Sequence, residues 1–191
     1  MSIKQHIWFF TPKGVKPPYR NYHSVFGGFE ISRVDSCKFL GIILDHHLSF
    51  KPHINQLVSK VSKAVGIMYR IRRYINSKTA LTLYYSLIYP YLNYCNIIWA
   101  SNYPTYLLPL LRLQKRIIRI ILWFPCNAHT SHLFQSLKIL SIQQINHFQI
   151  GTCMYTFDHH MLPPLFDNIF TNTSPIHTYP VRTLHNYRSE N

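Results

Sequence analysis

The hydrophobic pattern of the chain changes its period at Asp45, and this change most restricts how the chain can fold. Before Asp45 the apolar residues come in short runs rich in β-branched and aromatic side chains, which is typical of strands. After Asp45 apolar residues recur at steps of three and four, which is the period of an amphipathic helix. The sequence therefore predicts an α+β chain, with a small antiparallel sheet followed by a mainly α-helical part.

Three or four short strands are predicted before the change of period. Gly27-Gly28 can form a tight hairpin turn, because glycine adopts positive φ without a steric penalty. A further turn is expected at Asp35-Ser36. The predicted strands are residues 3–10, 22–26, 29–34 and 39–44. So few strands are not expected to form an independent β domain.

The helix boundaries are predicted from capping residues and prolines. Ser49 is an expected N-cap, with Pro52 in the first turn. Ser141 and Gln144 have the spacing of a capping box. The predicted helices run from Ser49 through Ile71, over 78–96 with a bend at Pro90, over 106–123, over 132–137, and onward from Ser141.

Positive charge is unopposed by acids throughout the helical part. The chain has 20 Lys and Arg against six Asp and Glu, a net charge of +14. Between Asp45 and Asp158 there are twelve Lys or Arg and no acidic residue. Such a field attracts polyanions such as phosphate backbones or anionic lipid. The alternative is an alkaline protein whose charge serves only solubility. In such a protein, acidic residues normally stand among the Lys and Arg residues, which is not the case here.

Most of these cations fall on two helix faces. The first cationic stripe is Lys60, Lys63 and Arg70, with Arg73 nearby, and the second cationic stripe is Arg112, Lys115, Arg116 and Arg119. Arg72 falls near the apolar side of its helix and breaks the pattern. Solvated helix faces are usually mixed in sign, whereas regularly spaced cations can contact phosphates without reading base sequence. We therefore predict nucleic-acid binding through the two stripes.

Catalytic and metal chemistry find little support in the sequence. Two-metal phosphoryl transfer needs carboxylates gathered around ions about 4 Å apart, and the chain has no Asp-Asp, Asp-x-Asp or Glu-x-Asp pair. Cys126, His129 and His132 could supply metal ligands, and Cys126 could be a thiol nucleophile. A fourth ligand at regular spacing and an activating context are both missing. No metal site is predicted.

A membrane span and a disulfide framework are both disfavoured. Residues 79–111 carry no charged side chain, which exceeds the roughly 20 residues of a bilayer span, but prolines and asparagines interrupt them. A buried helical hairpin explains this segment better. The four cysteines are widely spaced without a CxxC pair, which favours a reducing intracellular compartment.

Several blocks of the sequence, taken in order, resemble reverse transcriptases of non-LTR (LINE-type) retrotransposons. Asp35-Ser-Cys-Lys-Phe-Leu-Gly-Ile-Ile-Leu-Asp45, followed by Leu48-Ser-Phe-Lys-Pro-His-Ile54, is similar to the end of the palm in that family. Further blocks, similar to the first thumb helix and the helices after it, are residues 66–72, 83–99, 113–119, 128–130 and 133–140. The likeness runs from about Lys4 to Arg182.

The resemblance implies both a division of the chain and roles for some residues. The division is a palm remnant with a primer-grip-like loop over 1–47, a helical thumb over 48–125, a helical extension over 126–162 and an irregular tail over 163–191. Lys38, Phe39, Leu40 and Gly41 would match the loop that holds the 3′ end of the primer. Lys4 would match a lysine thought to donate a proton to pyrophosphate, although Gln5 stands where the family usually has Thr.

The family's catalytic Asp-Asp motif lies upstream of the matched region. The resemblance thus implies a truncated fragment of an RNA-directed DNA polymerase, inactive alone, whose thumb would grip a template–primer duplex. The parent enzyme would use magnesium and deoxynucleotides, and the fragment is expected to bind neither. The expected partners are RNA or an RNA–DNA duplex, together with the missing fingers and palm. The alternative is a non-enzymatic nucleic-acid-binding or membrane-associated protein.

Overall fold

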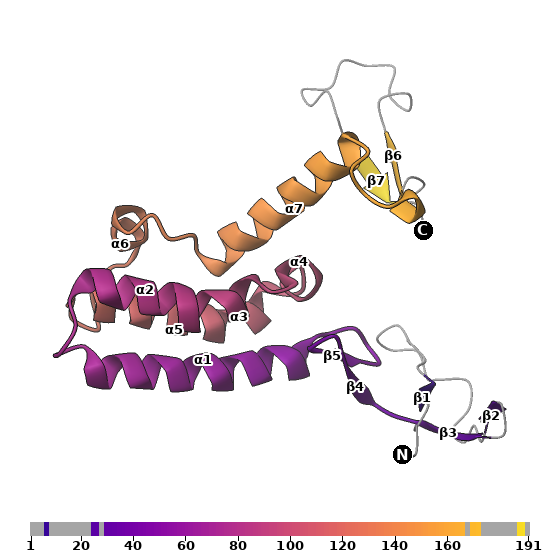
Figure 1. Ribbon diagram of the computed structural model, residues 1–191, viewed down its shortest axis with the longest axis horizontal. Coiled ribbons are helices and arrows are strands. Elements are labelled where there is room, and N and C mark those ends of the chain that lie inside the picture. The colour runs from indigo at the N-terminus through magenta and orange to yellow at the C-terminus, as the bar shows by residue number, and fades with distance from the viewer. Residues whose placement is uncertain (1–5, 8–23, 27–28, 167–168, 173–186, 190–191) are drawn as a thin grey trace. The chain divides into compact units, whose positions relative to one another are not determined.

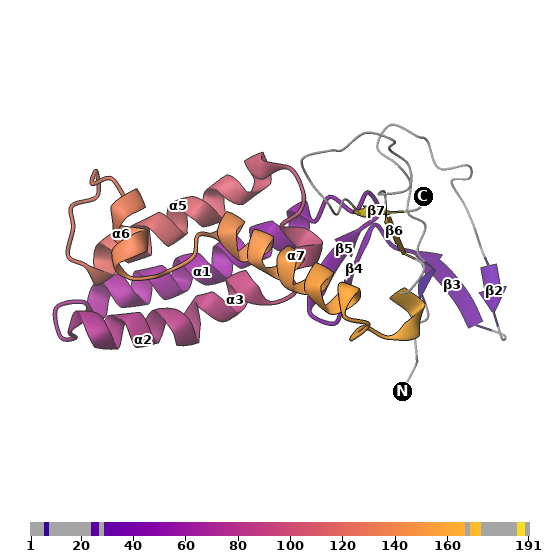
Figure 2. The same cartoon turned by 90° about the horizontal axis from the view of Figure 1, so that it is seen from above.

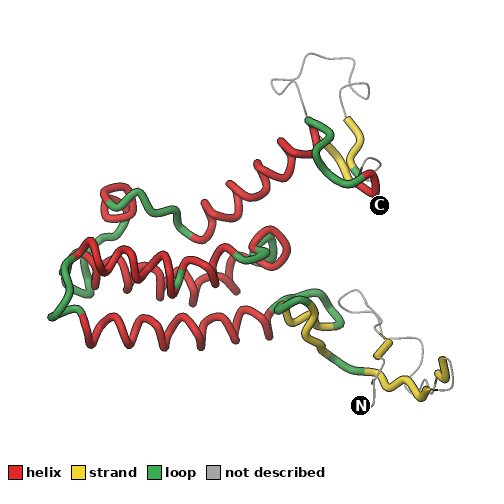
Figure 3. The backbone as a smooth tube through the Cα atoms, viewed as in Figure 1, coloured by secondary structure: helices red, strands yellow, loops and turns green. Residues whose placement is uncertain are grey.

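A computed structural model of the chain describes residues 6–7, 24–26, 29–166, 169–172 and 187–189. The chain divides into two compact units, Met1–Asn146 and His147–Asn191. Strands β1 to β5, helices α1 to α6 and the start of α7 belong to the first unit, and the remaining elements belong to the second (Figures 1 and 3). The predicted α+β class is confirmed.

The strands of the first unit form two small sheets. They are β1 (His6–Ile7), β2 (Ser24–Phe26), β3 (Phe29–Arg33), β4 (Ser36–Phe39) and β5 (Ile42–Asp45). β3 pairs antiparallel with β2 and parallel with β1, while β4 and β5 form a separate antiparallel hairpin. The predicted pairing of residues 22–26 with 29–34 is confirmed. Gly27-Gly28 and most of the predicted strand 3–10 lie outside the described residues.

The prediction of one strand over 39–44 is wrong, because the chain reverses direction inside it. Leu40 and Gly41 have φ angles of 44° and 87°, and Phe39 pairs with Ile42. The two residues therefore form a two-residue hairpin turn of the type in which both φ angles are positive. The Tyr94 hydroxyl donates a hydrogen bond to the Leu40 carbonyl at 2.6 Å. This bond ties the hairpin tip to the helical part of the unit.

The helices are α1 (Lys51–Ile71), α2 (Ser77–Leu87), α3 (Tyr89–Asn93), α4 (Asn96–Trp99), α5 (Pro104–Ile121), α6 (Ser131–Ser136) and α7 (Ile142–Asp158). α1, α2 and α5 lie side by side, and α3 continues the line of α2 (Figures 1 and 2). Within the described ranges, no helix is both long and apolar enough to cross a membrane.

The predicted helix 78–96 is divided into three pieces rather than only bent. α2 ends at Leu87, and α3 begins again with Pro90 in its first turn, where the missing N–H of proline costs nothing. A second break follows at Cys95, whose φ angle of 47° lies in the left-handed region. Trp99 on α4 is fully buried, and its indole N–H donates to the Tyr94 carbonyl at 2.9 Å.

Asp45, the last residue of β5, organises the chain between the hairpin and α1. One oxygen of its carboxylate accepts hydrogen bonds from the Ser49 N–H at 3.1 Å and the Ser49 hydroxyl at 2.8 Å. The other oxygen accepts from the Phe50 N–H at 2.7 Å. The prediction that Ser49 caps α1 is wrong: Phe50 is the N-cap residue, in a left-handed conformation with no side-chain cap.

A buried amide, Gln114 on α5, joins three parts of the first unit. Its Nε2 donates to the Tyr84 hydroxyl at 3.0 Å and to the Leu140 carbonyl at 2.8 Å, while its Oε1 accepts from the Ile142 N–H at 2.9 Å. Burial raises the pKa of Tyr84, so its hydroxyl stays neutral. Because buried polar groups stabilise a fold only when they are paired, Gln114 fixes where α2 and the start of α7 dock on α5.

Two predictions about short elements near α7 are confirmed. The helix expected over 132–137 is α6. The capping box is formed, since the Ser141 N–H donates to Gln144 Oε1 at 2.9 Å and the Gln144 N–H donates to Ser141 Oγ at 3.3 Å.

Three helices end in left-handed residues that are not glycine. The residue that follows each C-cap bears the positive φ angle, and the next N–H bonds back to a carbonyl five residues earlier, which is the Schellman arrangement. These residues are Trp123 (φ 59°), Lys138 (φ 52°) and His160 (φ 52°), with the bonds Phe124 to Arg119, Ile139 to Phe134 and Met161 to Thr156. A non-glycine residue costs about 1–2 kcal/mol in this conformation.

The second unit consists of the rest of α7, the 3-10 turn η1 (Pro164–Phe166) and the strands β6 (Phe170–Asn172) and β7 (Tyr187–Ser189). β6 and β7 pair antiparallel. The Phe157 and Phe170 rings pack edge to face, with their ring centres 5.0 Å apart. An irregular tail was expected over 163–191; its described part instead contains these two paired strands.

The carboxylate of Asp45 makes stability depend on pH. Burial alone would raise its pKa, but the hydrogen bonds from Ser49 and Phe50 outweigh burial and hold the pKa below its usual value near 3.8. The unfolded chain therefore binds the proton more readily, and stability falls as pH drops through this range. We expect Asp45→Asn to lower the free energy of unfolding at pH 7 by about 1–2 kcal/mol.

Urea denaturation at several pH values checks this prediction. The difference between Asp45→Asn and the parent chain should shrink as pH falls below about 4. Asp35→Asn is the matched control, because the Asp35 side chain is exposed. A difference of the same size at all pH values, or an equal loss in the control, would contradict the role of the carboxylate.

Candidate nucleic-acid interface

The second cationic stripe follows the side of α5 opposite its core face. The buried positions of α5 are Leu107, Leu110, Gln114, Ile117, Ile118, Ile120 and Ile121. Arg112 and Arg116 are exposed, while Lys115 and Arg119 are half-buried. The helical period thus brings the four cations to one face, as the sequence predicted. Their contact with nucleic acid stays a prediction.

The first cationic stripe lies on the exposed side of α1 and continues past its end. Lys60, Lys63 and Arg70 are exposed on α1, and Arg73 is exposed beyond Ile71, where α1 ends. The Lys60 ammonium lies 5.5 Å from the centre of the Tyr91 ring on α3. Lys60 therefore makes an intramolecular cation–π contact that leaves it on the surface.

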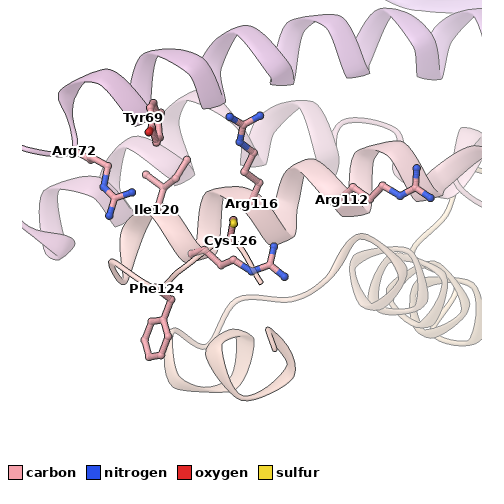
Figure 4. Close-up of a pocket in the computed structure, with 8 residues that line it drawn as sticks. Tyr69, Arg72, Arg112, Arg116, Ile120, Phe124 and Cys126 are labelled. Atoms are coloured by element: carbon pink, nitrogen blue, oxygen red, sulfur yellow. The ribbon is translucent and has the colours of Figure 1, made fainter. Parts of the chain in front are cut away.

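Arg72, which the helical wheel set aside, joins the two helices at a cavity of about 460 Å³ (Figure 4). Four arginines, one from the end of α1 and three from α5, reach this four-arginine cavity. Its lining residues are Tyr69, Arg72, Arg112, Arg116, Arg119, Ile120, Phe124 and Cys126. The sequence analysis set Arg72 aside because the wheel places it near the apolar side of α1, and this is the side that packs on α5, so Arg72 reaches the cavity between the two helices.

The arginines in this cavity are held in different ways. The Arg72 guanidinium lies 4.2 Å from the Trp123 ring centre and 5.9 Å from that of Tyr69. Its Nε is buried and has no hydrogen-bond acceptor in the part of the chain that the structure describes. Arg119 Nε donates to the Ala128 carbonyl at 2.9 Å. Arg72 and Arg119 are thus anchored, and the exposed side chains of Arg112 and Arg116 face solvent.

No carboxylate on these helices offsets the charge of the cavity, since residues 46–157 include no Asp or Glu. The carbonyl ends of α1 and α5 both lie here, and each carries a partial negative charge that offsets part of the repulsion among the four arginines. A bound anion would offset the rest of that repulsion. The cavity is therefore an attractive position for a phosphate group.

The predicted primer-grip-like residues occupy the tip of the β4–β5 hairpin. Lys38 and Phe39 end β4, and Leu40 and Gly41 form the turn. The Leu40 side chain is 73% exposed and that of Phe39 is 60% exposed, which is high for large apolar residues. Lys4, the weak catalytic candidate, lies outside the described residues.

The described residues do not fit a magnesium ion. Two free carboxylates would be needed, yet within the described ranges no three His, Cys, Asp or Glu side chains gather. Both oxygens of Asp45 are taken by Ser49 and Phe50. Cys126 is exposed in the four-arginine cavity and forms no disulfide.

Comparison with known proteins gives one informative match. Over 144 residues the chain is 23% identical to the probable RNA-directed DNA polymerase from transposon X-element of Drosophila melanogaster. The match covers 74% of this chain and 15% of that protein, so the chain spans a small part of its relative. No protein-family model matches the sequence, and no solved structure matches the fold. The likeness supports a relationship to reverse transcriptases.

Proposed function

We propose that the chain is part of an RNA-directed DNA polymerase of a transposable element, and that its helices bind the template–primer duplex. The observation that carries the proposal is the meeting of Arg72 with the second cationic stripe at one cavity, on helices without an acid. The match to the transposon polymerase supports the class of protein. The charge and spacing of the cations support the class of ligand.

The second cationic stripe would make the main phosphate contacts. Residues three and four apart on a helix lie about 5–6 Å from one another, so a duplex along α5 could meet several cations of the stripe in turn. Arg112 and Arg116 have exposed guanidinium groups, which can bind phosphate with two parallel hydrogen bonds. Lys60, Lys63, Arg70 and Arg73 would provide further contacts from α1.

The remaining parts of the chain take roles that follow from the same relationship. Residues 1–47 would be a part of the palm, in which Lys38 to Gly41 hold the primer end at the hairpin tip. Residues 48–125 would form the thumb and residues 126–162 an extension. The partner of this chain would be the polymerase segment that supplies fingers and catalytic palm.

The first experiment tests duplex binding and its salt dependence. Each phosphate contact that is lost should lower the slope of log affinity against log salt concentration by about 0.9. We expect Arg112→Gln and Arg116→Gln each to weaken binding to an RNA–DNA duplex and to reduce the slope by about that amount. Charge reversal at Lys60 and Arg116 should weaken it further. Fluorescence anisotropy over a salt series measures both quantities.

Lys51→Gln is the matched control for these variants. Lys51 is an exposed cation of α1 outside both stripes, and its ammonium lies 5.8 Å from the Tyr106 ring. Its replacement should leave the slope within error of the parent chain. Equal slopes for all variants, or affinity that does not depend on salt, would contradict phosphate binding by the stripes.

A second experiment tests whether these residues can synthesise DNA alone. We expect the chain to bind without polymerising, because its six acids include no adjacent or alternate pair that could hold two metal ions. Primer extension with magnesium and deoxynucleotides should show no incorporation above background. Incorporation that survives further purification would overturn this part of the proposal.

A further inference from the structure

Trp123 occupies a position that a helix end normally gives to glycine. It follows the C-cap of α5 with a φ angle of 59°, a conformation that L side chains rarely adopt. The left-handed turn carries the indole outward, where 51% of its surface is exposed. Burial in the core therefore does not account for a large aromatic residue in a strained conformation here.

Two tyrosines and three arginines lie near Trp123. They line a second cavity of about 480 Å³, formed by Tyr69, Arg70, Arg72, Arg73, Tyr74 and Trp123. The Tyr74 side chain is 87% exposed. Arg72 lines both this cavity and the four-arginine cavity, so the two share a side chain. A volume of this size is in the range of sites for small organic ligands, about 300–1,000 Å³.

We infer that this aromatic–arginine patch, made of Tyr69, Arg72, Tyr74 and Trp123, binds an unpaired nucleotide of single-stranded RNA or DNA. Bases of every kind present a π face that stacks on exposed aromatic rings, and neighbouring cations hold the phosphates. The bases inside a duplex are already stacked on one another, so their faces are not available to stack on exposed rings of the protein. The inference goes beyond the proposed duplex binding, because it assigns a second site to an unpaired strand.

The state of Arg72 fits this assignment. Its guanidinium is already stacked on Trp123 at 4.2 Å, which orients the group before any ligand arrives. Its buried Nε has no acceptor among the described residues, and a phosphate oxygen would supply one. A base on the free face of Trp123 and a phosphate at Arg72 would together occupy the shared side of the two cavities.

The test compares three RNA–DNA hybrids with the full chain. The first has blunt ends, the second has a short unpaired overhang, and the third has an abasic overhang that keeps the phosphates but lacks the bases. We expect the overhang to tighten binding roughly five- to hundredfold, since one stacked base has about that effect. The abasic overhang should keep only the part of the gain that its phosphates contribute, and should therefore bind more weakly than the complete overhang. An equal gain from the abasic overhang would overturn the inference.

The variant Trp123→Gly distinguishes a loss of binding at the patch from a loss of folding. Glycine is suited to the left-handed position, so the thermal midpoint should stay within about 4 °C of the parent chain, while the gain from the overhang should be lost. Tyr103→Ala is the control, because Tyr103 is 59% exposed at the other end of α5, and it should keep the gain. If Trp123→Gly does not fold, Tyr74→Ala tests the same patch and should reduce the gain.

A binding measurement with a single-stranded oligonucleotide distinguishes the single-strand site from the proposed duplex binding. Binding of the single strand with quenching of tryptophan fluorescence that Trp123→Gly abolishes, but without binding of the blunt hybrid, would contradict the proposed duplex binding and support the patch. Binding of the blunt hybrid with no gain from any overhang would support the proposed duplex binding and contradict the patch as a site for an unpaired nucleotide. A gain that survives in both Trp123→Gly and Tyr74→Ala would also overturn the assignment.

Discussion

Unopposed positive charge on α1 to α6 governs how these helices can pack. A cation buried without a partner costs several kcal/mol, and residues 46–157 contain no carboxylate to serve as one. The cations must therefore stay where water or a polyanion reaches them, and the apolar faces of the helices must meet one another. The buried polar side chains of residues 46–157 are uncharged: Gln114, Asn96, Asn146, Thr130 and His53, where burial and the charge of Lys60 lower the histidine pKa.

The same constraint connects the core to the candidate site. Gln114 fixes α5 against α2 and the start of α7 from inside the core, and the opposite face of α5 then presents the second cationic stripe. At the far end, the left-handed turn at Trp123 brings an aromatic ring beside Arg72 from α1. Anchored arginines and exposed arginines are thus neighbours at one cavity, and the two anchored side chains, Arg72 and Arg119, need little further ordering to meet a phosphate.

The sequence predicted those features that depend on periodicity. The apolar spacing predicted α1 and α5 and placed Arg112 and Arg116 opposite the core, because a helix face follows from sequence spacing alone. It missed the turn at Leu40-Gly41, because the run Phe39–Leu44 is apolar throughout and has no common hairpin dipeptide. It misjudged Ser49, since Phe50 is the N-cap residue and the shortest hydrogen bond of the Ser49 hydroxyl is to Asp45, although Ser49 Oγ also accepts from the Lys51 N–H at 3.4 Å. Arg72 and Trp123 lie 51 positions apart in the chain, so only the tertiary packing of α1 on α5 could bring them together.

Lysine acetylation of the full chain, with and without a bound RNA–DNA duplex, tests most directly whether the sorted cations hold nucleic acid. The account predicts that the duplex slows acetylation at Lys60, Lys63 and Lys115, and that Lys51 and Lys138 react at unchanged rates. Protection spread evenly over all five lysines, or confined to Lys51 and Lys138, would contradict it.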